Sequence, residues 1–354
     1  MTFILYGAYG YTGRLIAQEA VERGHRPILA GRDAAQLNEM GHSLDLPVRI
    51  VSLQEKSRLR SVLEEAAAVL HCAGPFVRTA PPMVRACLET STHYLDLAGE
   101  IEVFRRMADR HEKAASAGIM LLSGIGFDVV PSDCLARYVA TQVPSATTLE
   151  VALCADGDVS QGTLKTLVEQ MGQGGLVRRA GQLREVPPGW TSRTVDFGDR
   201  DRRVVSIPEG SVVTTGRSTD VPNVTAYLTL PQAVRRLVRG NRHVRRLLTW
   251  RPLKRLLKQL VELRPDGPSA EARRQGRTVV WASARRGTEE SVSARLHGPE
   301  AYTFTVRAAL AGVERVLDGT APSGYQTPST AFGADFVLDI PGVERTHLGE
   351  ASSS

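Results

Sequence analysis

The amino-acid sequence predicts an α/β fold, with a doubly wound parallel sheet joined to a second domain of α+β type. Two observations indicate the sheet: short apolar runs alternate with helical stretches over the first third of the chain, and a glycine-rich turn follows the first run. A third observation indicates the second domain, where several short segments alternate polar and apolar residues. A length of 354 residues, of which 42% are hydrophobic, suits two packed cores.

The predicted parallel sheet has six strands separated by helices. Each strand is a short apolar run, and each helix has apolar residues at helical spacing. Strands that alternate with helices form a parallel sheet with right-handed crossovers. The expected strands are residues 3–6, 26–30, 48–51, 68–72, 94–96 and 119–122, and the expected helices are one that ends at Gly24, then 34–42, 56–65, 81–89 and 102–117.

The turn after the first strand contains three glycines with the spacing G-x-x-G-x-x-G. Glycine permits the backbone angles of a tight turn and lets a diphosphate approach the backbone closely. The helix that follows offers free N–H donors and the positive end of its dipole to that anion. An ordinary strand-to-helix turn is the alternative interpretation of the glycines alone. The turn predicts a Rossmann-type dinucleotide site with these cofactor-binding residues: Gly7, Tyr9, Gly10, Tyr11, Thr12 and Gly13.

The second strand ends at Gly31-Arg32-Asp33. In a dinucleotide-binding sheet this strand end meets the adenosine ribose, where a carboxylate holds the 2′-hydroxyl of NAD and an arginine accommodates the 2′-phosphate of NADP. Arg32 is placed for that phosphate, and its planar guanidinium suits it. Asp33 is expected to cap the next helix instead. We therefore predict NADP as the cofactor, with a surface arginine in a turn as the alternative for Arg32.

Three further segments follow strands of the predicted sheet, and each combines glycine with polar or aromatic residues. Ligands of such sheets lie beyond the carboxyl ends of the strands. The segments are Cys72–Phe76, Asp96–Glu100 and Gly124–Asp128. Each segment alone could be an ordinary glycine-containing loop, but three such segments after strands of the same sheet favour a ligand site. They add these cofactor-binding candidates: Ala73, Gly74, Pro75, Phe76 and Gly99.

Several motifs together resemble the saccharopine dehydrogenase-like oxidoreductases, in particular the branch that contains the trans-acting enoyl reductases. They are Gly7–Gly13, Ala30–Arg32, Cys72–Phe76, Tyr94–Glu100, Gly126–Asp133, Gly298–Thr303 and Thr327–Gly333. The resemblance implies an NADP-binding Rossmann domain, a substrate domain and reduction of an α,β-unsaturated (enoyl) thioester or a related intermediate of lipid or polyketide biosynthesis. Because the family also includes imine reductases, reduction of a C–N bond in an amino-acid-like substrate is the alternative.

In such a reductase the cofactor supplies the hydride, and the protein supplies a proton or polarises an oxygen. None of the eight tyrosines has a lysine four residues later, which excludes the standard Tyr-x-x-x-Lys pair. We predict Asp96, Asp128 and Tyr302 as catalytic residues, with Glu100 at the same edge. The structural alternatives are that the carboxylates hold loops or cap a helix and that Tyr302 lies in the core. No metal site is expected, because the sequence lacks H-E-x-x-H and its four cysteines lack metal-ligand spacing.

The domain boundaries follow from changes in these patterns. We expect an NADP-binding domain over 1–128, a substrate domain over 129–325, a C-terminal helical segment over 326–345 that packs back on the first domain, and a disordered tail over 346–354. In the second domain, residues 172–189 are rich in glycine, arginine and proline and are expected to form a mobile loop. The expected strands there are 147–155, 194–197, 203–207, 212–214, 224–229, 278–284 and 291–297.

Residues 231–264 carry much of the net charge of +6 and read as two basic amphipathic helices that break at Pro252. A pair of domain helices with solvated basic faces is one interpretation. The others are docking to an acidic acyl carrier protein and attachment to an anionic membrane surface. These leave open a non-catalytic NADP-binding protein that docks on lipid or carrier. Nucleic-acid binding is not expected, because no known motif accompanies the charge and only 5% of residues are aromatic.

The chain enters its first strand directly, with no basic n-region and no cleavage site, so we expect a cytoplasmic protein, with a membrane-peripheral position open to it through the basic helices. The unpaired pattern of the cysteines fits a reducing compartment. A homo-oligomer is compatible with the sequence.

Overall fold

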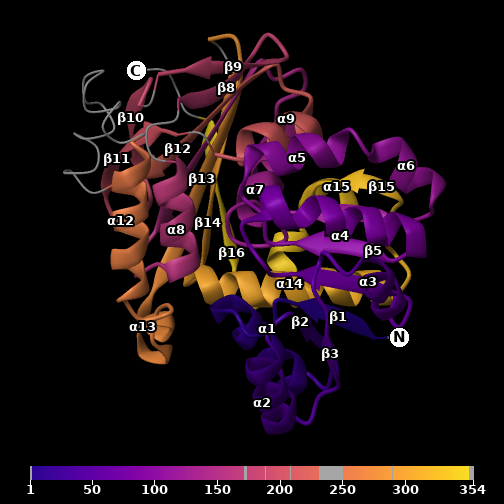
Figure 1. The fold of residues 1–354 in the computed structure, drawn as a ribbon. Helices are drawn as coiled ribbons and strands as arrows, with labels where there is room; N and C mark the ends of the chain where they lie inside the picture. Colours follow the sequence, from indigo (N-terminus) through magenta and orange to yellow (C-terminus); the bar gives the residue numbers. More distant parts are fainter. Residues whose placement is uncertain are drawn as a thin grey trace. The chain divides into compact units, whose positions relative to one another are not determined.

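The structure is a computed structural model that describes residues 2–170, 174–187, 189–207, 209–230, 250–288 and 290–350. The chain divides into two compact units (Figure 1). The first comprises Met1–Val130 and Tyr302–Pro341, and the second comprises Pro131–Ala301 and Gly342–Ser354. Within the described residues, no helix is both long and apolar enough to cross a bilayer.

The first unit contains a parallel sheet with the strand order β15-β6-β5-β4-β1-β2-β3. The central strands are buried along their whole length, as expected for a parallel sheet covered on both faces. This confirms the predicted doubly wound α/β fold. The strands are β1 (Phe3–Tyr6), β2 (Ile28–Gly31), β3 (Val48–Ile50), β4 (Ala68–His71), β5 (His93–Asp96), β6 (Met120–Ser123) and β15 (Gly324–Gln326).

The crossover helices of the first unit are α1 (Tyr11–Glu22), α2 (Ala34–Leu44), α3 (Lys56–Leu63), α4 (Phe76–Thr90), α5 (Ile101–Ala108) and α6 (His111–Ser116). Two predictions were wrong in detail. The stretch 102–117 is two helices, because the backbone leaves helical geometry at Arg110, with ψ near 4°. Helix α4 begins at Phe76, well before Pro81. It continues through that proline because Arg106 Nη1 donates to the Val77 carbonyl at 3.1 Å, which Pro81 has no N–H to satisfy.

Residues 302–325 lie in the first unit, whereas the sequence analysis assigned them to the substrate domain. Helix α14 (Ala301–Leu317) buries an apolar face that includes Phe304, Leu310 and Val313. Strand β15 then pairs with β6, which extends the sheet by one strand. The sequence of β15 is too short for its pairing to be evident without the structure. Two short helices complete the segment, α15 (Pro328–Phe332) and η1 (Phe336–Asp339).

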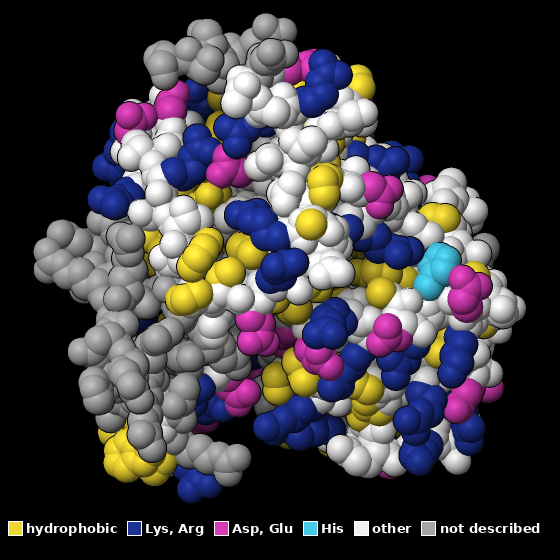
Figure 2. Space-filling model, turned by 90° about the horizontal axis from the view of Figure 1, so that it is seen from above, with side chains coloured by type: hydrophobic (Ala, Val, Ile, Leu, Met, Phe, Trp, Pro, Cys, Tyr) yellow, Lys and Arg dark blue, Asp and Glu magenta, His cyan; other side chains and the backbone are white. Residues whose placement is uncertain are grey.

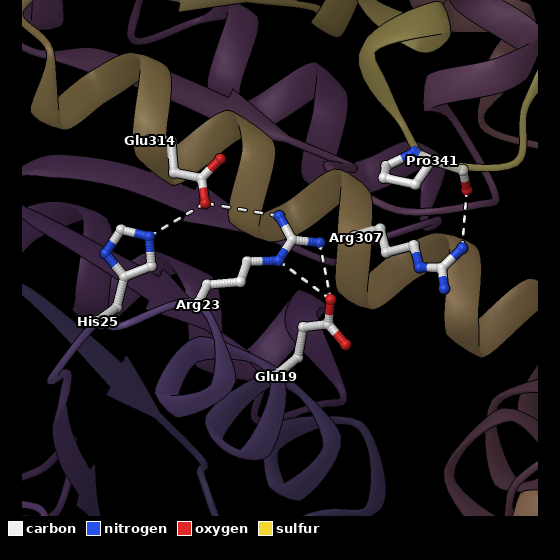
Figure 3. Close-up of polar contacts among 6 residues, drawn as sticks. All are labelled: Glu19, Arg23, His25, Arg307, Glu314 and Pro341. Carbon is white, nitrogen blue, oxygen red and sulfur yellow. Dashed lines mark hydrogen bonds and ion pairs between the residues drawn. The ribbon is translucent and has the colours of Figure 1, made fainter.

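Polar contacts also attach α14 to the first unit (Figure 3). Glu314 accepts from the Nε2 of His25 at 3.0 Å and lies 3.5 Å from the Nη1 of Arg23, just beyond the end of α1. Further along, Arg307 Nη1 donates to the Pro341 carbonyl at 2.7 Å. Helix α14 and the chain that follows it as far as Pro341 are therefore part of the first unit.

The second unit is built on a mixed sheet with the order β10-β11-β12-β7-β13-β14-β16, and β8 pairs with β12 and with β9. Its strands are β7 (Thr148–Ala155), β8 (Gly175–Arg179), β9 (Gln182–Val186), β10 (Ser192–Asp196), β11 (Asp201–Ser206), β12 (Asn223–Thr229), β13 (Arg277–Arg286), β14 (Glu290–Pro299) and β16 (Glu344–Glu350). The described helices are α7 (Val130–Gln142), α8 (Gln161–Gln170), α9 (Ser211–Thr219), α12 (Arg251–Glu262) and α13 (Ala270–Gln275).

Three expectations for the second unit were wrong. Residues 174–187, expected in a mobile loop, form the β8–β9 hairpin, because Gly181 supplies the positive φ of the turn. Residues 212–214 lie in helix α9, whose first two turns are largely buried, with Val212, Thr214 and Thr215 in the interior. Residues 346–350, expected to be disordered, belong to strand β16, which pairs with β14. Of the basic segment 231–264, residues 231–249 lie outside the described ranges, and helix α12 begins at Arg251 with Pro252 in its first turn.

Candidate active site

The glycine turn between β1 and α1 has the close contacts that its sequence predicts. Gly7 has φ +83°, and a Cβ there would lie 2.8 Å from the Ala73 nitrogen on the loop after β4. A Cβ on Gly13 would lie 2.5 Å from the Gly7 carbonyl oxygen. Gly10 precedes α1 and provides no side chain to cap it. The turn therefore brings the start of α1 against two strand ends and leaves its first N–H groups without a side-chain cap, as an anion site requires.

Arg32 is exposed directly after β2 and makes no ion pair or hydrogen bond with any residue that the structure describes. Asp33 caps α2 as predicted: its Oδ1 accepts from the Gln36 N–H at 3.1 Å. The ring of Tyr9 crosses the Gly31 backbone, since a Cβ on Gly31 would lie 2.8 Å from the Tyr9 Cε1. The guanidinium predicted to bind a 2′-phosphate is therefore exposed next to the Gly31 backbone that Tyr9 covers, and it interacts with the neighbouring Asp33 carboxylate only through charge.

The loop after β4 is joined to the loop after β5. The Phe76 N–H donates to the Oε1 of Glu100 at 3.0 Å, and Thr79 Oγ1 donates to the Ala73 carbonyl at 2.6 Å. Gly74 and Pro75, between these anchors, are exposed. The two anchors hold the predicted cofactor loop from both sides.

Asp96 ends β5 and is fully buried. Its Oδ1 accepts from the backbone N–H groups of Ala98 at 2.9 Å and Gly124 at 3.0 Å, and its Oδ2 accepts from Tyr94 at 2.7 Å and Ser123 at 3.0 Å. Burial raises the pKa of this carboxyl, and these four donors oppose the shift. Asp96 therefore fixes the loops that follow β5 and β6, which is the structural alternative considered for it.

His71, which the sequence analysis did not single out, extends this buried network. Its Nδ1 lies 3.2 Å from the Tyr94 hydroxyl, which in turn donates to Asp96. Burial lowers the pKa of His71 to about 3, so its imidazole is neutral at physiological pH. Since Tyr94 uses its own proton for Asp96, His71 donates through Nδ1. A histidine at the end of an apolar strand was the available signal, and it resembles an ordinary core residue.

The loop after β6 lies against both the β5 loop and α14. A Cβ on Gly99 would lie 3.0 Å from the Asp128 Oδ2, and the Phe127 N–H donates to Thr305 Oγ1 at 3.1 Å. One helical turn before Thr305, the ring of Tyr302 meets that of Tyr11 edge to face, with centroids 5.1 Å apart. Asp128, Gly99 and Tyr302 are thus brought to the same edge of the sheet as the glycine turn.

Two carboxyl groups at this edge are shifted toward their neutral forms. Burial, with a smaller contribution from Asp96, raises the pKa of Glu100 to about 7. Asp128 reaches the surface, yet the surrounding protein desolvates it enough to raise the pKa of its carboxyl. A carboxyl that titrates near neutral pH can give or take a proton under physiological conditions. Within the described ranges, no group of three metal-ligating side chains occurs.

A model of the saccharopine dehydrogenase NADP binding domain matches residues 3–122, the stretch that contains the glycine turn, Arg32 and the first six strands. These residues are therefore similar to the NADP-binding domain of saccharopine dehydrogenase. NADP is therefore the cofactor class of the domain, as predicted.

Curated relatives match part of the chain. A trans-acting enoyl reductase of Mycobacterium leprae is 37% identical over 138 residues, which are 37% of this chain and 33% of the relative. A mouse saccharopine dehydrogenase-like oxidoreductase is 28% identical over 202 residues, or 50% of this chain and 47% of the relative. The matches therefore span between a third and a half of these relatives' lengths.

Solved structures share the fold along nearly the whole chain. Saccharopine dehydrogenase (L-Glu forming) from Saccharomyces cerevisiae has a TM-score of 0.68 at 10% identity, covering 98% of this chain and 100% of that one. Homospermidine synthase from Legionella pneumophila, in complex with NAD, has a TM-score of 0.65 at 10% identity, covering 98% and 91%. Both likenesses confirm the fold: a unit with a parallel sheet covered by helices and a second unit with a mixed sheet.

Proposed function

We propose that this protein is an NADPH-dependent reductase whose reaction centre lies at the carboxyl edge of the first sheet. The observation that carries the proposal is an unbroken series of contacts along that edge. It runs from Gly7 to Ala73, from Phe76 to Glu100, from Gly99 to Asp128, from Phe127 to Thr305 and from Tyr302 back to Tyr11. Such an edge is where parallel α/β sheets bind their ligands.

The residues present fit NADP. The close approaches at Gly7 and Gly13 permit a diphosphate at the uncapped start of α1, together with Tyr11 and Thr12. Arg32 offers a guanidinium without a partner for the 2′-phosphate. The anchored loop at Ala73–Phe76 and Gly99 lie toward the reactive end. When bound, NADPH supplies a hydride.

Side chains of the protein would then supply the proton that completes the reduction. Glu100, with a pKa of about 7, and Tyr302 are the proposed proton donors, and Asp128 orients the acceptor. Asp96 is a positioning residue, because its four hydrogen bonds fix the loops that carry Glu100 and Asp128. In its neutral form, Glu100 can donate a proton to the acceptor.

An enoyl thioester is the proposed acceptor, supported by the relatives named as enoyl reductases. Hydride addition at its β-carbon leaves an enolate, whose α-carbon takes the proton from Tyr302, Glu100 or water. The second candidate is an imine, because the carboxyl groups of Glu100 and Asp128 in their ionised forms would stabilise an iminium cation.

The finer proposal on partners concerns residues 250–264, the described part of the basic segment. Helix α12 exposes Leu256 and Leu260, which would suit an acyl carrier protein or a lipid surface. However, Lys258 pairs with Glu169 on α8, and Lys254 donates to the Glu169 carbonyl. On the face that Figure 2 shows, basic and acidic side chains are interspersed. These contacts also fit the alternative in which α12 is a domain helix with a solvated basic face and not a docking surface.

The first test is a fluorescence titration with NADPH and with NADH. The wild type should prefer NADPH, and Arg32→Ala should weaken NADPH binding about tenfold or more while leaving NADH unchanged, which is the value of a lost charge-assisted hydrogen bond. Arg58→Ala, an exposed arginine of α3 paired with Glu55, is the matched control and should change neither affinity. Failure of both nucleotides to bind would contradict the proposal.

The second test follows NADPH consumption with crotonyl-pantetheine and with a cyclic imine as acceptors. Turnover of the thioester alone supports the enoyl proposal, and turnover of the imine alone supports the second candidate. If the protein binds NADPH tightly but turns over neither, the non-catalytic binding role is favoured instead.

A further inference from the structure

The second unit contains a polar cavity of about 330 Å³ that is separate from the nucleotide residues in sequence and in element. This volume is in the range of sites for small ligands. Its lining comes from β7, β8, β12, β13 and the segment before β10. The lining residues are Thr148, Glu150, Arg179, Trp190, Thr191, Asn223, Thr225, Tyr227 and Arg285.

Strand register explains how two arginines far apart in sequence meet in this cavity. Arg285 pairs with Thr148, and Thr148 pairs with Asn223 on the next strand. Arg179 follows Arg178, which pairs with Val224, the neighbour of Asn223. Four adjacent strands therefore carry Arg285 and Arg179 at the ends of one row. With strands about 4.8 Å apart, the two Cα atoms are about 14 Å from each other, so both guanidinium groups can reach an anion held above the middle of the row.

The middle of that row is polar but uncharged. Thr148 and Asn223 lie there, and the Asn223 amide is held by its donation to the Thr147 carbonyl at 2.7 Å. Oxygen and amide groups of this kind can add hydrogen bonds to a ligand without repelling an anion.

The charges in the cavity are unbalanced. Glu150 is compensated, because it pairs with Arg193 and accepts from the Tyr227 hydroxyl at 2.8 Å. Among the residues that the structure describes, Arg179 donates only to neutral oxygens, the Arg178 carbonyl and the Thr225 hydroxyl, both at 3.2 Å. Arg285 has no side-chain partner among the described residues. Two guanidinium groups therefore face one cavity without a carboxylate of their own.

The exposed indole of Trp190 adds an apolar wall to this cationic site, with 55% of its surface accessible. A planar guanidinium binds carboxylate and phosphate with two parallel hydrogen bonds, and a flat apolar group stacks favourably on an indole. From this combination we propose that the cavity is a binding site for a small organic anion. Its carboxylate or phosphate lies between Arg179 and Arg285, and its flat apolar part lies against Trp190.

Calorimetric titration of the full chain with phenyl phosphate, benzoate and inorganic phosphate tests the site. We expect phenyl phosphate or benzoate to bind more tightly than inorganic phosphate, and the order of the two tells which anion the site prefers. Arg179→Gln and Arg285→Gln should each weaken binding about tenfold, the value of one charge-assisted hydrogen bond. Trp190→Leu should weaken the two aromatic anions and leave inorganic phosphate unchanged.

Arg286→Gln is the matched control. Arg286 is the next residue of β13, points to the other face and already pairs with Glu290 at 2.7 Å. The Arg286→Gln variant should bind all three probes as the wild type does. Equal losses in Arg285→Gln and Arg286→Gln, or no binding of any probe to the wild type, would overturn the proposal. Arg285 is exposed, so its substitution should leave folding intact, and an unchanged NADPH titration verifies this in every variant.

Discussion

The two compact units bring their functional residues together in different ways. In the first unit the candidate residues other than Tyr302 lie at or soon after the ends of strands, so a parallel sheet collects them at one edge whatever the details of packing. In the second unit the cavity residues meet only through strand register, as Thr148 and Arg285 do. A site of the first kind leaves a motif in the sequence, whereas a site of the second kind leaves none. The difference explains why the sequence suggested candidate nucleotide-binding residues but did not indicate the arginine pair.

The largest expected effect comes from Gly13→Ala, which would disrupt the close contact between Gly13 and the Gly7 carbonyl oxygen in the glycine turn. The added Cβ would lie 2.5 Å from the Gly7 oxygen and 2.7 Å from the Ala8 oxygen, both backbone atoms that cannot turn aside. We expect a loss of about 3 kcal/mol in the free energy of unfolding, at the upper end for overpacking, and loss of NADPH binding. Chemical denaturation followed by circular dichroism, with an NADPH titration, measures both.

Gly24→Ala is the control for that substitution. Gly24 follows the other end of α1 with φ +83°, but a Cβ there would meet nothing within 4 Å. The cost should be about 1 kcal/mol from backbone strain alone, with NADPH affinity unchanged. Equal effects of the two variants on NADPH affinity would show that the glycine turn has no special role. Because Trp190, Trp250 and Trp281 all lie in the second unit, tryptophan fluorescence reports separately on whether that unit unfolds with the first.

The sequence predicted the parts of the fold whose chemistry is local. The glycine turn, the cap at Asp33 and the alternation of strands and helices each depend on a few neighbouring residues. The errors involve distant partners: β15 pairs with β6, β16 pairs with β14, and α4 passes through Pro81 because Arg106 satisfies the freed carbonyl. None of these contacts leaves a local pattern. The same limit applied to Asp96, whose type and position were evident but whose four buried donors were not.

A smaller effect is expected at Glu100, where the first unit's site and its stability are coupled through pH. The pKa of this carboxyl rises from 4.5 to about 7 on folding, so the folded state binds the proton more tightly. Its contribution to stability is therefore fully present below pH 4.5 and is lost as the pH rises through about 7, about 3 kcal/mol in total. Glu100→Gln keeps an acceptor for the Phe76 N–H but does not titrate. It should flatten the dependence of unfolding free energy on pH in this window.

Glu102→Gln provides the comparison for Glu100. Glu102 lies two residues later on α5, is exposed and pairs with Arg106 at 3.0 Å. Its substitution should leave the slope of stability against pH as in the wild type. A slope that persists in Glu100→Gln would assign the titration to another group and remove Glu100 from the proposed proton donors.

The smallest effect concerns the second unit, where the register that aligns the strands is supplemented by contacts between distant ones. Arg295 on β14 donates through Nη2 to Asp196 at the end of β10, at 2.8 Å, although several strands separate the two in sheet order. The sheet must therefore curl to bring its β10 edge to β14. Its concave side holds a core cluster that includes Phe197, Tyr227 and Trp281. Because Asp196 is largely exposed, Arg295→Gln should cost only about 1 kcal/mol.

This loss should appear in the tryptophan-fluorescence transition and leave NADPH affinity unchanged, the converse of Gly13→Ala. Arg286→Gln removes an exposed pair with Glu290 on the same hairpin and should cost close to nothing. If Arg295→Gln weakened NADPH binding as strongly as Gly13→Ala, the nucleotide edge would depend on the second unit's sheet. The contrast between a site formed by local motifs and a site formed by strand register would then not hold for the first unit. Its candidate nucleotide site could no longer be attributed to motifs within residues 3–122 alone.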